Sequence, residues 1–119
     1  MKKPHFAIDE VQALVQARRV RWSITKAADP LKNDYGGNWK QNGWRILGEI
    51  ESAAFHGSLG QAHLLYDVYG IRYDGTGWYV KVTIENVIDP AGVVAERLYA
   101  MSCHPLTAKL RTNAGEVEP

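Results

Sequence analysis

Cysteine is almost absent from this chain of 119 residues, and long apolar runs are absent altogether. The single cysteine, Cys103, excludes an internal disulfide and favours a reducing, cytoplasmic setting. No apolar run approaches the roughly 18 residues that span a bilayer, so we expect no membrane partner. Lys2 and Lys3 are not followed by the apolar segment of a secretory signal. The four histidines lack metal-ligand spacing, so we expect neither a metal nor another cofactor.

Net charge is also small, at +1, but it is unevenly distributed. The first 26 residues contain a group of cations that only Asp9 and Glu10 oppose: Lys2, Lys3, Arg18, Arg19, Arg21 and Lys26. This segment suits an anionic partner. The alternative interpretation is a solvated helix end.

The first half of the chain predicts helices. Residues 7–19 place Ile8, Val11, Leu14 and Val15 on one face at helical spacing. The other elements expected before residue 58 are an extended step at 20–22, a short helix at 24–29 that Pro30 ends, a turn-rich loop at 32–38, a helix at 39–50 and one helical turn after Ser52.

The second half predicts an antiparallel meander. Residues 78–85 alternate apolar and polar side chains, which is typical of a half-buried strand. The turn residues Asp74–Gly77 pair this strand with residues 64–73, and a second turn at 89–92 leads to a strand at 93–103. We therefore expect one α+β domain at residues 1–104, with helices on one face of a twisted antiparallel sheet. Residues 105–119 read as a flexible tail.

One face of this sheet has a composition that suits RNA. If Trp78 and Val80 face the helices, Tyr79, Lys81 and Thr83 share the opposite face. Aromatic rings stack on unpaired bases, and cationic side chains neutralise phosphates. Cleaving RNA without a metal needs a base, a cation and an acid, which His, Tyr, Lys and Arg can supply. The alternative is structural, because tyrosine and threonine are also good strand formers on solvated faces.

Two blocks of the chain carry a family resemblance. The first is KKPHFAIDEVQALVQARRVRWSITKAA, and the second is YDVYGIRYDGTGWYVKVTI. Together they resemble the MqsR family of toxin–antitoxin mRNA interferases, which belongs to the RelE-like α+β ribonucleases. The segment ESAAFHGSL between them is similar to that family's short acidic-Phe helix. The likeness spans residues 2 to about 85 in the family's order.

The resemblance implies a RelE-like fold and a cytoplasmic toxin that cuts mRNA without a metal. The 2′-hydroxyl of the RNA would attack, leaving 2′,3′-cyclic phosphate and 5′-hydroxyl ends. The implied partners are mRNA, a cognate antitoxin protein and, if cleavage depends on translation, the ribosome. The strand tyrosine and lysine of the family fall on Tyr79 and Lys81. Departures occur where the family has a catalytic lysine, a glutamine and a second lysine, and this chain has Gly57, Tyr66 and His104.

We assign candidate catalytic roles to four residues. Tyr79 would stack on a base or donate to the scissile phosphate, and Lys81 would stabilise negative charge. His104 and His56 would supply acid–base function where the family uses lysines. Candidate RNA-binding residues are Arg97, Tyr66, His63 and Arg21. A Cys103–His104 nucleophile pair is disfavoured because neighbours in a strand point to opposite faces. The alternative function is a non-catalytic RNA-binding or toxin-inhibiting module of the same fold.

Overall fold

Helices form from the first half of the chain. The computed structural model describes residues 1–119 and contains α1 (Ile8–Gln16), α2 (Asp29–Tyr35) and α3 (Trp39–Gly48). The apolar stripe of α1 buries Val11 and Val15, and that of α3 buries Ile46 and Leu47. The helices at 7–19 and 39–50 are therefore confirmed, with slightly shorter bounds. None of the helices is long and apolar enough to cross a membrane.

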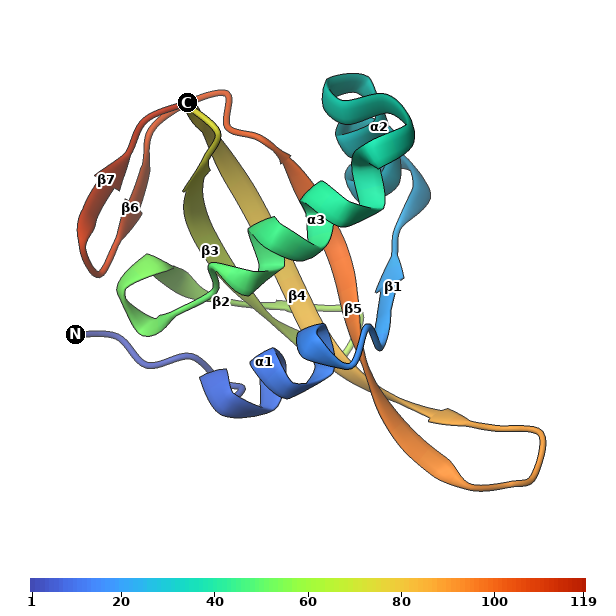
Figure 1. The fold of residues 1–119 in the computed structure, drawn as a ribbon. Coiled ribbons are helices and arrows are strands. Elements are labelled where there is room, and N and C mark those ends of the chain that lie inside the picture. The colour runs from blue at the N-terminus through green and yellow to red at the C-terminus, as the bar shows by residue number, and fades with distance from the viewer.

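Most of the second half folds into one sheet, which a short strand from the first half joins at one edge. Its strands are β1 (Val20–Trp22), β2 (Phe55–Gln61), β3 (Leu64–Tyr73), β4 (Thr76–Ile88) and β5 (Val94–Pro105). They lie in the order β1-β5-β4-β3-β2. Neighbours are antiparallel except β1, which runs parallel to β5. Figure 1 shows α1 and α3 lying across one face of this sheet, so the α+β class is confirmed.

The core lies between the helices and that face of the sheet. Trp78, Tyr69 and Phe55 are its largest fully buried side chains. Trp78 and Val80 point toward the helices as predicted and belong to the same apolar cluster as Val11 and Leu47. This arrangement leaves the opposite face of β3, β4 and β5 free of helices.

The segment around Pro30 differs from the prediction. Pro30 does not end a helix: η1, a π-helical turn at Ile24–Ala28, runs directly into α2, with the proline in its first turn. A proline is tolerated there because the first helical residues need no intrahelical N–H donor. The predicted loop at 32–38 is wrong for the same reason, since α2 continues to Tyr35. Only η2, a 3-10 turn at Gly36–Asn38, follows it.

The helical turn predicted after Ser52 is shorter than expected. η3 (Ser52–Ala54) is a single 3-10 turn, and from Phe55 the chain becomes β2. The sequence FHGSLGQ lacks the alternation of a strand with one buried face. Instead it forms a sheet edge, held by backbone pairing with β3. The prediction missed this strand.

A β-bulge in β5 changes which side chains share a face. Lys81 lies opposite Ser102 and Val82 lies opposite Ala100, so Met101 has no partner on β4. A bulge inserts one extra residue and reverses the alternation beyond it. Strict alternation along residues 93–104 predicts that Ser102 and His104 share a face with Leu98, and that prediction is therefore wrong. Ser102 and His104 share the face of Arg97 and Tyr99.

Residues 105–119 form a hairpin where the sequence predicts a flexible tail. Strands β6 (Leu110–Thr112) and β7 (Gly115–Val117) pair with each other. A Cβ added at Gly70 would lie 3.1 Å from side-chain atoms of Leu110 and Thr112. The hairpin thus packs closely against β3, on the sheet face opposite the helices. These two strands could not be predicted from the sequence, because neither is long enough to show a hydrophobic periodicity.

Candidate functional site

The candidate site lies on the helix-free face of the five-stranded sheet, which we call the second sheet face. Four polar residues of β4 that share this face each lie directly opposite a residue of β5 in the antiparallel register. The pairs are Tyr79 with His104, Lys81 with Ser102, Thr83 with Tyr99, and Glu85 with Arg97. Six of the eight predicted site residues gather on this face: Tyr79, Lys81, His104, Arg97, Tyr66 and Arg21.

Tyr79 and His104 form a stacked pair. Their ring centroids are 5.1 Å apart and the ring planes differ by 14°. Burial raises the pKa of the Tyr79 phenol, so at neutral pH it is a hydrogen-bond donor and not a base. His104 Nδ1 lies 3.0 Å from the Pro105 carbonyl oxygen. A carbonyl only accepts, so Nδ1 carries a proton and Nε2 of the neutral ring is free to accept one.

Lys81 is held deep in the second sheet face. The residue is only 7% exposed. Its ammonium donates to Gln61 Oε1 at 3.1 Å and lies 5.6 Å from the ring centre of Tyr66. Burial, together with repulsion from Lys26, lowers the Lys81 pKa. One of its three N–H donors is occupied by Gln61, and the other two remain for a ligand.

An Arg–Glu–Arg cluster borders this group. Glu85 accepts two hydrogen bonds from Arg21, each at 2.9 Å, and one from Arg97 at 2.8 Å. Hydrogen bonding from Arg21, and then from Arg97, holds the pKa of the Glu85 carboxyl below its usual value. The Arg21 guanidinium also stacks 3.6 Å above the ring centre of Tyr99. The cluster has two cations for one anion, so it keeps a net positive charge.

Two predicted residues lie elsewhere. His56 is on the edge strand β2, separated from β4 by β3, and its Nδ1 lies 2.6 Å from the Arg111 carbonyl oxygen. His63 is at the tip of the β2–β3 turn, where both Ala62 and His63 have positive φ angles. The structure therefore does not bring either imidazole to Tyr79, Lys81 and His104.

Tyr66 exposes less of its side chain on the second sheet face than we expect of an RNA-binding residue. It is 4% exposed, and burial raises the pKa of its phenol. The structure adds Gln61, Tyr99 and Ser102 to the site. Tyr99 was predictable from the sequence, because it lies two residues after Arg97 in the same strand and therefore on the same face. Gln61 had none, since its contact with Lys81 depends on the turn between β2 and β3.

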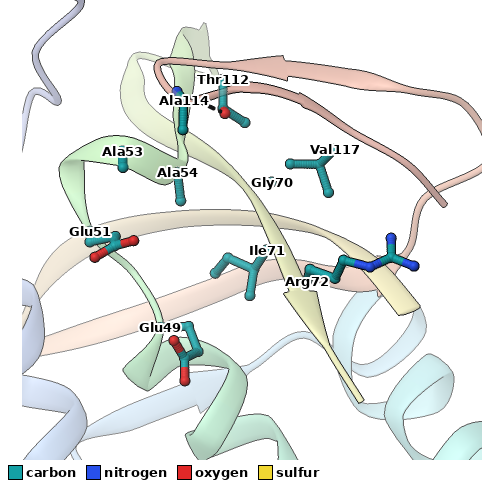
Figure 2. Close-up of a pocket in the computed structure, with 10 residues that line it drawn as sticks. All are labelled: Glu49, Glu51, Ala53, Ala54, Gly70, Ile71, Arg72, Thr112, Ala114 and Val117. Carbon is teal, nitrogen blue, oxygen red and sulfur yellow. Dashed lines mark hydrogen bonds between the residues drawn. The ribbon is translucent and has the colours of Figure 1, made fainter. Parts of the chain in front are cut away.

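A separate pocket of about 190 Å³ lies beside β3, at the part of its edge that β2 leaves uncovered. Figure 2 shows it between η3, β3 and the C-terminal hairpin, with Glu49 and Glu51 on one side and Arg72 on the other. The Arg72 guanidinium donates to the carbonyls of Glu118 and Gly75. None of the eight predicted site residues lines this pocket.

No cluster of three or more His, Cys, Asp or Glu side chains is placed to hold a metal ion. No model of a known protein family matches the chain, and no curated protein matches it.

Proposed function

We propose that the protein is a metal-independent endoribonuclease of RelE-like fold that acts as the toxin of a toxin–antitoxin system. The observation that carries this proposal is the row formed by His104, Tyr79 and Lys81. It joins an imidazole with a free nitrogen, a neutral phenol and a buried ammonium on one helix-free sheet face. These three groups suit the 2′-hydroxyl chemistry of RNA cleavage.

His104 is the general base in this proposal. Its Nε2 takes the proton of the RNA 2′-hydroxyl while the 2′-oxygen forms a bond to the adjacent phosphorus. The Nδ1 hydrogen bond to the Pro105 carbonyl fixes the tautomer that this role needs. Stacking on Tyr79 fixes the plane of the ring.

Lys81 acts on the phosphate. Its ammonium balances the negative charge that builds up on the phosphate oxygens as the 2′-oxygen attacks. The bond from phosphorus to the 5′-oxygen breaks, and that oxygen takes a proton from Lys81. A lowered pKa makes Lys81 a better acid than an exposed lysine. Tyr79 donates its hydroxyl to a phosphate oxygen, and the products are a 2′,3′-cyclic phosphate and a 5′-hydroxyl.

Arg21, Arg97 and Tyr99 provide the neighbouring RNA contacts. Glu85 orients both guanidinium groups, and their remaining N–H donors suit phosphate oxygens. The Tyr99 ring, covered by Arg21 on one side, adds a further aromatic ring to the second sheet face.

The departures from the family pattern bear on this mechanism. The resemblance implies a glutamine where this chain has Tyr66, but Gln61 brings a side-chain amide to Lys81. It also implies a lysine where this chain has His104. His56 stands apart from this row, so the proposal gives it no part in proton transfer.

The test is cleavage of a long end-labelled RNA in the presence of EDTA. We expect discrete cuts with 5′-hydroxyl ends from the wild type. We expect losses of at least about 100-fold in His104→Ala, because removing a positioned acid or base costs about that much. His5→Ala serves as the matched control and should cleave normally. Growth arrest on expression should follow the same pattern.

Cuts that persist in His104→Ala and Lys81→Met would reject this site. The alternative, a non-catalytic RNA-binding or toxin-inhibiting module, has one observation in its favour. Only one imidazole lies on the second sheet face, where two were predicted. Under that alternative the wild type binds RNA and leaves it intact, with or without ribosomes.

A further inference from the structure

A second concentration of positive charge lies at the N-terminal edge of the molecule. Lys2, Lys3, His56 and Arg111, which we call the basic patch, come from the N-terminal segment, β2 and β6. The three ion pairs of the molecule involve none of them. The proposed cleavage site does not use this charge.

Two adjoining hollows run across the basic patch. One, of about 400 Å³, is lined by Lys2, His56 and Arg111 among others. The second, of about 490 Å³, is lined by Lys2, Lys3 and His56 together with β2 as far as Leu59. They share Lys2 and His56, and no aspartate or glutamate lines either one. The two hollows therefore form a continuous cationic surface.

The backbone beneath the basic patch is firmly held. Lys2 N–H donates to Asn113 Oδ1 at 3.0 Å, and Asn113 Nδ2 donates back to the Lys2 carbonyl at 2.8 Å. His56 Nδ1 donates to the Arg111 carbonyl, which leaves Nε2 directed away from that bond. The backbone at Lys2 and Arg111 is thus held by hydrogen bonds to segments that lie far away in the sequence.

The nearby carboxylates do not neutralise the basic patch. Asp67 is fully buried and accepts hydrogen bonds from the His5 and Phe6 amides and from the Ser58 hydroxyl. Glu116 lies opposite Arg111 in the β6–β7 pairing, without an ion pair between them. The basic patch therefore keeps a net positive charge, which attracts an anionic ligand.

We infer that the basic patch binds phosphates of the RNA strand that flank the cleavage point. This inference rests on the proposed function and extends it. β2 leads from His56 to Gln61, which contacts Lys81. At about 3.3 Å per residue, that path is about 16 Å long. It therefore spans no more than about five stacked nucleotides, at about 3.4 Å each.

The salt dependence of RNA binding tests this inference. The probe is a fluorescein-labelled single-stranded 12-mer RNA with every 2′-hydroxyl methylated, so that it binds without being cut. Affinity is measured by anisotropy over a series of KCl concentrations. Lys2→Gln/Arg111→Gln should reduce the slope of log K against log salt by about 1.4, or about 0.7 for each lost phosphate contact. At 0.1 M salt, this corresponds to affinity about 25-fold weaker.

Lys32→Gln/Lys40→Gln is the matched control. It removes the same charge from helices α2 and α3 and should bind like the wild type. A wild type that binds while the patch variant keeps the full slope overturns this inference alone. A wild type that fails to bind the probe even at low salt overturns both this inference and the proposed function.

Discussion

Lys81 illustrates the conflict between function and stability in a single side chain. A cation that is 7% exposed loses most of its hydration, and its one neutral acceptor, Gln61, does not restore that loss. The same loss of hydration lowers the pKa of Lys81. A cation buried at this cost in stability is a functional candidate.

We therefore expect Lys81→Met to stabilise the protein by about 1 kcal/mol at pH 7 while abolishing cleavage. Because the folded pKa of Lys81 lies below the unfolded one, the wild type gains stability as pH rises through the folded value. The difference in free energy of unfolding between Lys81→Met and the wild type should therefore narrow as pH approaches about 10. Urea unfolding at several pH values measures this. A less stable variant at pH 7 would show that Gln61 and Tyr66 fully compensate the buried charge.

Among the secondary-structure elements, those long enough to show a clear hydrophobic periodicity were predictable from the sequence. α1 and α3 followed from their apolar stripes, and β3, β4 and β5 from alternation and the turn at Asp74–Gly77. The elements that were missed lack a local signal. β2 is held by its pairing with β3, and β6 and β7 have three residues each.

The membership of the site was predictable in part, for a related reason. Alternation places Tyr79, Lys81 and Arg97 correctly, because β4 and the first half of β5 are regular. It fails beyond the bulge at Met101, which turns Ser102 and His104 toward the second sheet face. His56 was expected beside them, but β2 keeps it at the sheet edge.

The C-terminal hairpin depends on a glycine in β4. A Cβ at Gly77 would overlap the Glu118 carbonyl and lie 2.9 Å from Leu106 Cδ1. We expect Gly77→Ala to displace the hairpin and lower the free energy of unfolding by about 2 kcal/mol. Limited trypsin digestion after Lys109 or Arg111 should accelerate. Gly60→Ala, in a strand position with open space around it, is the control. Equal digestion of the two variants would mean that the hairpin adjusts without leaving β3.

The two blocks of the family resemblance meet in three dimensions. Asp67, from the second block, accepts hydrogen bonds from the backbone amides of His5 and Phe6, from the first block, at 3.0 and 2.9 Å. Asp67 is fully buried and also accepts a hydrogen bond from the Ser58 hydroxyl at 2.6 Å. This carboxylate therefore joins the N-terminal segment to the centre of the sheet.

Asp67→Ala should lower the free energy of unfolding by about 3 kcal/mol, since it leaves three donors without a charged acceptor. Amide exchange at His5 and Phe6 should rise far more than exchange in the strands β4 and β5. Asp34→Ala, at an exposed position, should leave both unchanged. Slow exchange at His5 and Phe6 in Asp67→Ala would show that other contacts hold the segment.

The hydrogen bonds between Lys2 and Asn113 join residues 111 positions apart. During synthesis, Lys2 leaves the ribosome long before Asn113 is made, so the N-terminal edge and the basic patch can be completed only after the C-terminal hairpin has emerged. A nascent chain that stops short of the hairpin leaves Gly70 and Gly77 of the second sheet face uncovered. The proposed phosphate-binding patch is therefore assembled only after this hairpin has been made.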